Sequence, residues 1–226
     1  MQNLNAPQER SPLYPRHHGA RLAPVGRGEL VAGYTEADER GLLSRCGLID
    51  LTCLARVGFR GAAAAEHLKI RGFLLPDAPN RALTQADGSH VARLSQTEYL
   101  LLGSLADGGE RIAGEERGWQ FGASANYLLP RQDSHAWLML TGEWISQVMA
   151  KLCAVDLRPE AFPRGSVAQT SAARINVIIV NAGPAELPCF QLLCDRASVD
   201  YFWDVLLDAM GEFGGQPVGI DALAPR

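Results

Sequence analysis

The residues of this chain that could carry chemistry are few and widely spaced. His17 and His18 are adjacent in a proline-rich stretch, and neighbouring side chains of an extended backbone point to opposite sides, which disfavours a shared metal. Cys189 and Cys194 are five positions apart on a predicted strand, so they too are expected on opposite faces. The sequence has no phosphate-binding loop, no HExxH, no CxxC and no GxSxG. These patterns favour neither a metal centre nor a nucleophilic enzyme.

The remaining histidines offer no obvious general base. His67 lies in a predicted helix beside a glutamate, and His90 and His135 begin predicted strands. Each is interpreted as a surface or edge residue rather than a proton-transfer group.

Six polar residues are candidates for contacts to a ligand or partner. Asp195 and Arg196 follow a strand and precede a helix, where a cap with a salt bridge is the favoured interpretation and an anionic ligand or partner loop is the alternative. Gln169, Thr170 and Arg174 are candidate cleft contacts. For these three, polar positions on an edge or solvent-facing strand are the slightly favoured interpretation. The sixth candidate, Glu186, comes from a family resemblance described below.

Composition bounds the class of protein. The chain has 226 residues, 47% of them hydrophobic and 20% charged, with a formal net charge of -4. Such a chain can bury a full core, and its charge gives no general attraction to nucleic acid or anionic lipid. Its apolar runs are far shorter than the roughly 20 residues of a membrane helix. Without an apolar signal core near Met1 we expect a cytoplasmic protein whose five cysteines are buried free thiols.

The order of predicted elements indicates two similar halves. After an extended arm at residues 1–33, we expect a helix capped by Thr35, and then two successive runs of strands and helices. The first half (34–130) has a strand Gly47–Gly61, a helix Ala62–Arg71 ended by Gly72, strands His90–Ser95 and Glu98–Ser104, and a short exposed helix or loop over Asp107–Gly118. The second half (131–226) has a strand Ser134–Gly142, a helix Glu143–Cys153, strands Val167–Val180 and Cys189–Asp195, a helix Ser198–Met210 and a tail.

The shared β-α-β-β-α order predicts an α+β protein built from two ferredoxin-like halves related by a pseudo-twofold axis. In each half the crossover is expected to build a parallel strand pair and the hairpin an antiparallel edge. A cleft near the axis is the default site for a ligand or partner.

Three stretches carry a resemblance to a known family. Ser11–Leu22, Arg45–Gly61 and Phe190–Ala209 resemble the folate-binding aminomethyltransferase family of the glycine cleavage T-protein. Cys153–Val180 together with Phe190–Ala209 is similar to one branch of that superfamily, the gamma subunit of heterotetrameric sarcosine oxidase. The resemblance extends from about Ser11 to Leu223 and implies a T-protein-like folate-binding fold.

The resemblance also implies partners. In that branch, alpha, beta and delta subunits complete the enzyme, and NAD, FAD and FMN are expected in the partner subunits. The gamma-type chain is an accessory subunit, so no cofactor is expected on this chain alone, although tetrahydrofolate stays an option.

The sequence departs from the T-protein pattern where catalysis would be expected. The stretch Asn181–Leu193 keeps Phe190 and Glu186 but lacks the family's tyrosine and threonine, and Asp107 is out of register with the family's catalytic aspartate. The 226-residue sequence also ends before the point at which the family's carboxy-terminal barrel is expected. No catalytic residue is therefore predicted.

Two hypotheses follow from the resemblance. The favoured one is a non-catalytic accessory subunit of a sarcosine oxidase-like enzyme that demethylates N-methyl amino acids. Its predicted docking surfaces are the arm at residues 1–33, the tail after Met210 and the cleft rim near Arg174, Asp195 and Arg196. The alternative is a stand-alone tetrahydrofolate-binding protein similar to aminomethyltransferases. Whether ligand, partner or the chain's own side chains fill the cleft stays open.

Overall fold

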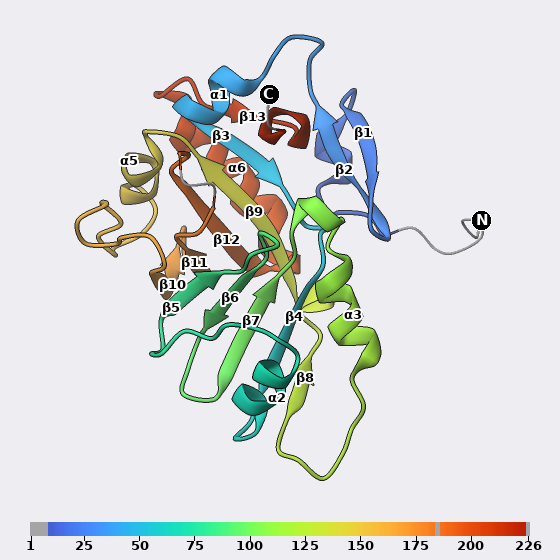
Figure 1. Cartoon of the computed structure of the whole chain (residues 1–226). Coiled ribbons are helices and arrows are strands. Elements are labelled where there is room, and N and C mark those ends of the chain that lie inside the picture. The colour runs from blue at the N-terminus through green and yellow to red at the C-terminus, as the bar shows by residue number, and fades with distance from the viewer. Residues whose placement is uncertain (1–8, 184–185, 225–226) are drawn as a thin grey trace.

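Two β-sheets and six α-helices make up most of the part of the chain that the computed structural model describes, residues 9–183 and 186–224 (Figure 1). The larger sheet has the strand order β10-β11-β12-β9-β3-β13, and the smaller one β5-β6-β7-β4-β8. Neighbours are antiparallel, apart from β13, which runs parallel to β3. Strands β1 (Arg21–Val25) and β2 (Gly28–Gly33) form a separate hairpin.

The strands and helices have the following bounds. The larger sheet consists of β3 (Gly47–Asp50), β9 (His135–Thr141), β10 (Val167–Ala172), β11 (Ile175–Val180), β12 (Cys189–Asp195) and β13 (Gln216–Pro217). The smaller sheet consists of β4 (Arg56–Arg60), β5 (Arg81–Thr84), β6 (His90–Arg93), β7 (Glu98–Leu102) and β8 (Tyr127–Leu129). The helices are α1 (Arg40–Arg45), α2 (Ala64–Ile70), α3 (Glu110–Gly118), α4 (Arg131–Ser134), α5 (Ile145–Ala150) and α6 (Val199–Gly211).

The hydrophobic core is layered because strands of the larger sheet contribute side chains to two clusters. Along β9, Leu138 and Leu140 pack with α5 and α6, whereas Trp137 and Met139 belong to a second cluster that also includes Leu100 of the smaller sheet. A third cluster joins β4, β6 and β7 to α2 and α3. Successive side chains of a strand point to opposite faces. The larger sheet therefore packs against helices α5 and α6 on one face and against the smaller sheet on the other.

The longest helix, α6, covers the back of the larger sheet. Val199, Phe202, Trp203 and Leu206 recur at helical spacing and are buried, and Leu207 is half-buried. This is the stripe that an amphipathic helix turns toward a core, and it confirms the sequence prediction for this segment.

Cysteine placement also agrees with the prediction. All five cysteines are free and buried. Cys189 lies in the cluster between the sheets, while Cys194 lies in the cluster facing α5 and α6. The two thiols are therefore on opposite faces of β12.

The predicted strand Gly47–Gly61 was wrong, because it is two strands in different sheets. Strand β3 ends at Asp50 and β4 begins at Arg56. The link between them turns at Leu51 and Leu54, where the Leu54 amide donates to the Leu51 carbonyl. Both halves of the run are apolar because both strands are buried, so hydrophobicity alone gave no sign of the break.

The predicted strand Val167–Val180 was likewise wrong, because it is the hairpin β10–β11. Its turn consists of Ala173 and Arg174, whose φ angles are 50° and 66°. Such left-handed turns usually carry glycine or asparagine, and this turn contains neither. It therefore left no recognisable signal in the sequence.

The segment expected to be an extended arm is folded where the structure describes it, from residue 9 onward; residues 1–8 lie outside the described part. A 3-10 turn (Tyr14–His17) is followed by the β1–β2 hairpin. Leu13 is fully buried in the cluster facing α6, and Arg16 forms ion pairs with Asp200 and Asp204 of that helix at 2.7 and 2.9 Å.

A buried carboxylate holds this segment in place. Ser11 donates to the Asp50 carboxylate, which also contacts His17 Nε2 at 3.0 Å and accepts from the Thr52 amide at 2.9 Å. Burial by itself raises the pKa of Asp50, but hydrogen bonds from His17, Ser11 and Thr52 outweigh it and leave the pKa below its usual range. The carboxylate therefore stays ionised and anchors the amino-terminal segment to β3.

The predicted helices were found, but several are shorter than expected. The helix expected from residue 36 is α1, which begins at Arg40, and Thr35 does not cap it, since the Glu39 carboxylate instead accepts from the Thr35 and Tyr34 amides. The predicted helix Glu143–Cys153 is confined to α5. Gly72 adopts a φ of 81° at the end of α2, which confirms its predicted role as a stop.

The expected parallel pairs within each half do not form side by side. Strands β4 and β6 both lie next to β7 and antiparallel to it, and β9 and β11 both lie next to β12 in the same way. The hairpin partner therefore separates the two crossover strands in each sheet.

We expect Phe202→Ala to lower the free energy of unfolding by about 3–5 kcal/mol, because it leaves a cavity at a fully buried position. Urea denaturation measures this change. The matched control is Tyr201→Ala on the same helix, whose side chain is 50% exposed and should cost about 1 kcal/mol or less. Equal losses for the two variants would contradict the packing of α6.

Candidate functional site

The sequence-predicted contact residues Gln169 and Thr170 lie on β10, at one edge of the larger sheet. Gln169 is exposed, and its Nε2 donates to Asn80 Oδ1 at 2.9 Å and to the Leu94 carbonyl at 2.7 Å. Thr170 is half-buried next to it. The glutamine therefore ties the edge of the larger sheet to loops of the smaller one.

Arg174 and Glu186 are both exposed. Arg174 occupies the tip of the β10–β11 hairpin, and Glu186 lies in the loop that leads into β12. Neither residue lines the cavities described below.

Asp195 and Arg196 lie at the opposite end of β12 and make internal contacts. The Asp195 carboxylate accepts from the Ala197 amide at 2.8 Å, which confirms a capping role. Arg196 donates from Nη2 to the Arg10 carbonyl at 3.1 Å and lies 3.8 Å from the Glu9 carboxylate. Its guanidinium therefore holds the amino-terminal segment.

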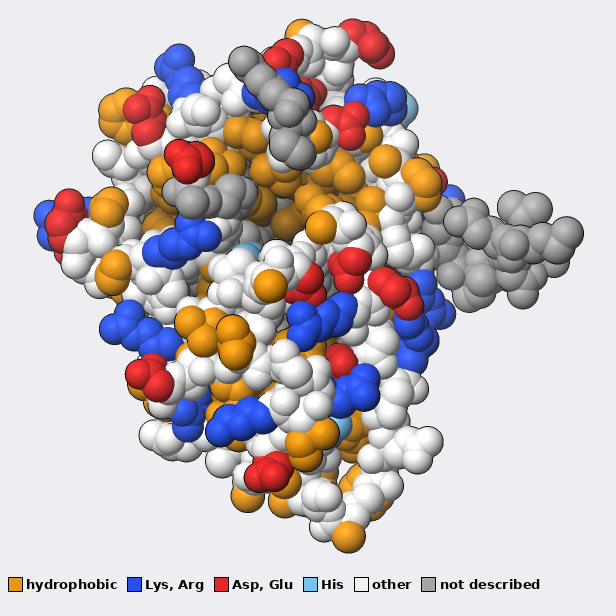
Figure 2. Space-filling model, in the orientation of Figure 1, with side chains coloured by type: hydrophobic (Ala, Val, Ile, Leu, Met, Phe, Trp, Pro, Cys, Tyr) orange, Lys and Arg blue, Asp and Glu red, His pale blue; other side chains and the backbone are white. Residues whose placement is uncertain are grey.

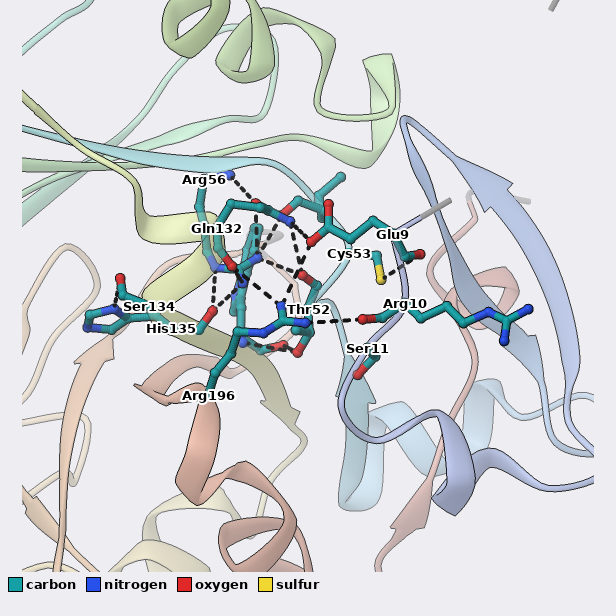
Figure 3. A network of polar contacts seen from close by, with 12 residues as sticks. Glu9, Arg10, Ser11, Thr52, Cys53, Arg56, Gln132, Ser134, His135 and Arg196 are labelled. Atoms are coloured by element: carbon teal, nitrogen blue, oxygen red, sulfur yellow. Dashed lines mark hydrogen bonds and ion pairs between the residues drawn. The ribbon is translucent and has the colours of Figure 1, made fainter. Parts of the chain in front are cut away.

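Arg196 belongs to a polar network centred on Arg56 (Figure 3). Arg56 is 1% exposed, and its Nη1 donates to the carbonyls of Thr52 and Leu54 at 2.7 and 3.0 Å. Its Nε donates to the His135 carbonyl at 2.9 Å. Gln132 adds a side-chain acceptor for Arg56 and donates to Glu9 at 2.6 Å. Because the donors of Arg56 are used internally, the network is a structural junction and not a ligand site.

The cleft between the sheets contains a cavity of about 390 Å³, which we call the central cavity. Its apolar wall includes Trp137 and Met139 of β9, with Leu51 and Leu54 from the link between β3 and β4. Its polar wall includes Gln191, which is 2% exposed. A cavity of this size and character matches small-molecule sites in general.

Three polar side chains of the central cavity, those of Thr84, His90 and Gln191, are already bonded to other protein groups. Gln191 Oε1 accepts from Trp137 Nε1 at 2.7 Å, and Gln191 Nε2 donates to the Ala182 carbonyl at 2.8 Å. His90 Nδ1 lies 3.1 Å from Thr84 Oγ1. At these three positions the cavity wall is therefore a fixed surface rather than a set of free hydrogen-bonding groups.

His90 corrects the sequence interpretation, which placed it at the surface or an edge. It is 6% exposed and lines the central cavity. Burial, followed by the positive charge of Arg164, lowers its pKa to about 4. The imidazole is therefore neutral at physiological pH.

A larger open groove of about 620 Å³ adjoins the central cavity and shares Arg164 and Gly183 with it. Its floor is apolar and includes Leu157, Pro188 and Phe190. This recess on the larger sheet was not predicted, because the residues that line it come from separate stretches of the sequence.

Three carboxylates line a separate pocket of about 280 Å³ between the β1–β2 hairpin and α3. Glu9 there is bonded to Gln132, and Glu110 forms an ion pair with Arg117. Burial, followed by the charges of Asp133 and Glu9, raises the pKa of Glu116. This pocket shares no lining residue with the central cavity.

Metal-ligating side chains are dispersed through the fold. Across residues 9–183 and 186–224, no group of three or more His, Cys, Asp or Glu side chains is placed to hold a metal ion. Asp107 caps α3, since its carboxylate accepts from the amides of Gly109 and Arg111 at 2.9 Å. None of the helices within that part of the chain is long and apolar enough to cross a bilayer.

Acid should destabilise the protein through His90. Its pKa lies near 4 in the folded state and near 6.5 when unperturbed, so between these values the unfolded chain binds more protons and stability rises with pH. His90→Gln removes the imidazole, so the rise in the free energy of unfolding from pH 4 to pH 7 should be smaller by about 3 kcal/mol in this variant. Urea denaturation at several pH values measures it.

The matched control is His18→Gln, which removes an exposed imidazole and should leave the slope as it is in the unchanged protein. If the free energy of unfolding changed equally between pH 4 and 7 with and without the His90 imidazole, the buried, neutral state of His90 would be contradicted.

Comparison with known proteins identifies relatives of two kinds. Aminomethyltransferase from Desulfitobacterium hafniense is 24% identical over 95% of this chain and 62% of its own length. Sarcosine oxidase subunit gamma from a Corynebacterium species is 27% identical over 70% of this chain and 72% of its own length. The chain thus spans about 62% of the length of the aminomethyltransferases it matches.

Solved structures share the fold at low identity. A chain of heterotetrameric sarcosine oxidase from Corynebacterium superposes with a TM-score of 0.63 at 23% identity, covering 93% of this chain and 98% of that one. Aminomethyltransferase T from Bartonella henselae gives 0.71 at 17% identity, covering 96% of this chain and 61% of that one. The mixed α+β fold is therefore T-protein-like.

The family described as sarcosine oxidase, gamma subunit matches residues 60–212, more than half of the chain. This stretch holds strands and helices from both sheets, including β9 and β12, which contribute residues to the central cavity. The chain belongs to the sarcosine oxidase gamma subunit family.

Proposed function

We propose that the chain is an accessory subunit, without a catalytic centre of its own, of a sarcosine oxidase-like enzyme for folate-linked oxidative demethylation of N-methyl amino acids. The observation that carries this proposal is the match to a chain of heterotetrameric sarcosine oxidase, which spans 98% of that chain. Family membership over residues 60–212 supports it. The partners would be alpha, beta and delta subunits, which would hold NAD, FAD and FMN in the cytoplasm.

The internal bonding of polar groups supports a non-catalytic role. Gln191, Arg56 and Asp50 are buried and are bonded to neighbouring protein groups. A group that already holds its hydrogen bonds in the resting protein has to break them before it can act on a substrate. These residues therefore stabilise the fold, and contacts to partners are left to the surface.

We also propose that the chain consists of two ferredoxin-like halves related by a pseudo-twofold axis, with boundaries near residues 33 and 130, and that strand β3 of the first half has joined the sheet of the second. Their strand orders support this, since β6-β7-β4 in one sheet corresponds to β11-β12-β9 in the other. Helices α2 and α5 follow β4 and β9, and helices α3 and α6 follow β7 and β12. Arg174, Glu186 and Gln169 would then be exposed contacts on the second half.

The alternative is a stand-alone tetrahydrofolate-binding protein similar to aminomethyltransferases, and one observation favours it, the TM-score of 0.71 with aminomethyltransferase T. The central cavity fits the cofactor poorly. The aminopyrimidinone edge of a pterin presents N–H donors that suit a carboxylate, whereas the central cavity is lined by one guanidinium, from Arg164, and no carboxylate among the described residues. The pocket that holds Glu9, Glu110 and Glu116 shares no lining residue with the central cavity, so these carboxylates do not supply the missing acceptor there.

Co-expression with sarcosine oxidase-like alpha, beta and delta chains from the same genome tests the proposal. We expect the four chains to elute together from size-exclusion chromatography, because an accessory subunit is stabilised by its partners. Omitting the alpha chain serves as the control. A stable, monodisperse monomer that never joins the other chains would contradict the proposal.

Calorimetric titration of the isolated chain with tetrahydrofolate separates the two hypotheses. We expect no measurable heat of binding. Tight binding with one site per chain would support the stand-alone alternative instead.

A further inference from the structure

Two hollows on opposite faces of the larger sheet join to form one recess. The central cavity and the open groove meet at Arg164 and Gly183, which line both. Figure 2 shows hydrophobic side chains gathered in a hollow over the region where Figure 1 draws β3 and β9. Helices α5 and α6 pack on the other face of this sheet, and the open groove lies on that side, where Ile145 and Gln147 of α5 line it.

Arg164 divides the recess and is held in place by its backbone. It occupies a turn in which the Ser166 amide donates to the Pro163 carbonyl at 3.0 Å and the Gly165 amide donates to the Asn181 carbonyl at 2.8 Å. Asn181 Nδ2 also donates to the Phe162 carbonyl at 2.7 Å. These bonds on both sides of residue 164 fix the point from which its side chain extends.

The guanidinium of Arg164 is held by one carbonyl. It donates from Nη2 to Gly183, and it forms no ion pair with any of the residues in 9–183 and 186–224. Gly183 leaves no room for a side chain, since a Cβ there would collide with Cys189 Sγ. The remaining N–H groups of the guanidinium are therefore available beside an apolar surface.

The charges around the recess favour an anion at this point. Arg164 is the one charged residue among the described residues that line the central cavity. In the groove, Arg158 is already paired with Asp156 at 2.6 Å, and Glu143 and Glu160 are exposed. Arg164 and His90 line the same cavity, and burial together with the charge of Arg164 lowers the pKa of His90.

We infer that this recess is the docking site for a segment of a partner subunit that carries a carboxylate with an apolar side chain on either side of it. The carboxylate pairs with Arg164, and the two apolar side chains enter the central cavity and the groove. A single small molecule would have to span the contact between Arg164 and Gly183, whereas a polypeptide crosses it and places side chains on both sides. This inference rests on the proposed function.

Charge reversal at Arg164 tests the inference in the co-expressed complex. Arg164→Glu should weaken association with the alpha, beta and delta chains at least tenfold, because it replaces a charge-assisted bond by repulsion between carboxylates. The matched control is Lys69→Glu, an exposed position on α2 with the same change of net charge, which should bind as the unchanged chain does. Affinity is measured by titrating the purified chain onto the immobilised partners.

A second variant tests the apolar part of the site. Leu105 is half-buried and lines the central cavity, so Leu105→Trp should fill the cavity and weaken association by a similar factor. Thermal unfolding of each isolated variant within a few degrees of the unchanged chain shows that loss of association is not loss of folding.

Three results would overturn the inference while leaving the proposed function intact. These are a complex in which Arg164→Glu and Leu105→Trp both associate normally, equal weakening by Lys69→Glu, or a small molecule found by mass spectrometry in the recess of the assembled enzyme. Failure of the unchanged chain to join any complex would instead overturn the proposed function.

Discussion

The fold depends on a buried positive charge that is held by backbone carbonyls. Arg56 begins β4, and its guanidinium reaches back to the carbonyls of Thr52 and Leu54 and across to that of His135, where β9 begins. Burial lowers its pKa to about 10, so it stays charged at neutral pH. The Arg56 side chain therefore fixes two places at once. One is the link between β3 and β4, where the chain passes from one sheet to the other, and the second is the start of β9. Removing it would leave several buried carbonyls without donors, which is costly.

The sequence predicted the elements better than their connections. Helix α6 and strands β9 and β12 were found because each has a continuous apolar pattern with a clear period, and Gly72 marked the end of α2. The breaks after Asp50 and at Ala173 were missed, since buried strands on both sides hid the first and a turn without glycine hid the second. Local pattern carries no information on which sheet a strand will join.

The candidate site was predictable only in part. Asp195 was correctly interpreted as a cap because its position between a strand and a helix is a local signal. Arg164 and Gln191 were not identified as parts of a recess, since their neighbours come from distant segments that only the folded chain brings together. A signal for the recess was present in the sequence. Trp137 and Met139 are two positions apart on a predicted strand, and Gln191 is a polar residue within the apolar run of a later predicted strand.

Strand β12 has a consequence for how this protein can vary. Its odd-numbered residues Cys189 and Leu193 face the space between the sheets, and its even-numbered residues Phe190 and Leu192 face α5 and α6. A single-residue insertion or deletion within the strand would exchange the two sets, sending Gln191 into the helix-facing core and an apolar residue into the recess. The two hydrophobic cores and the recess therefore share one register, so lineages of this family can change the composition of β12 far more readily than its length.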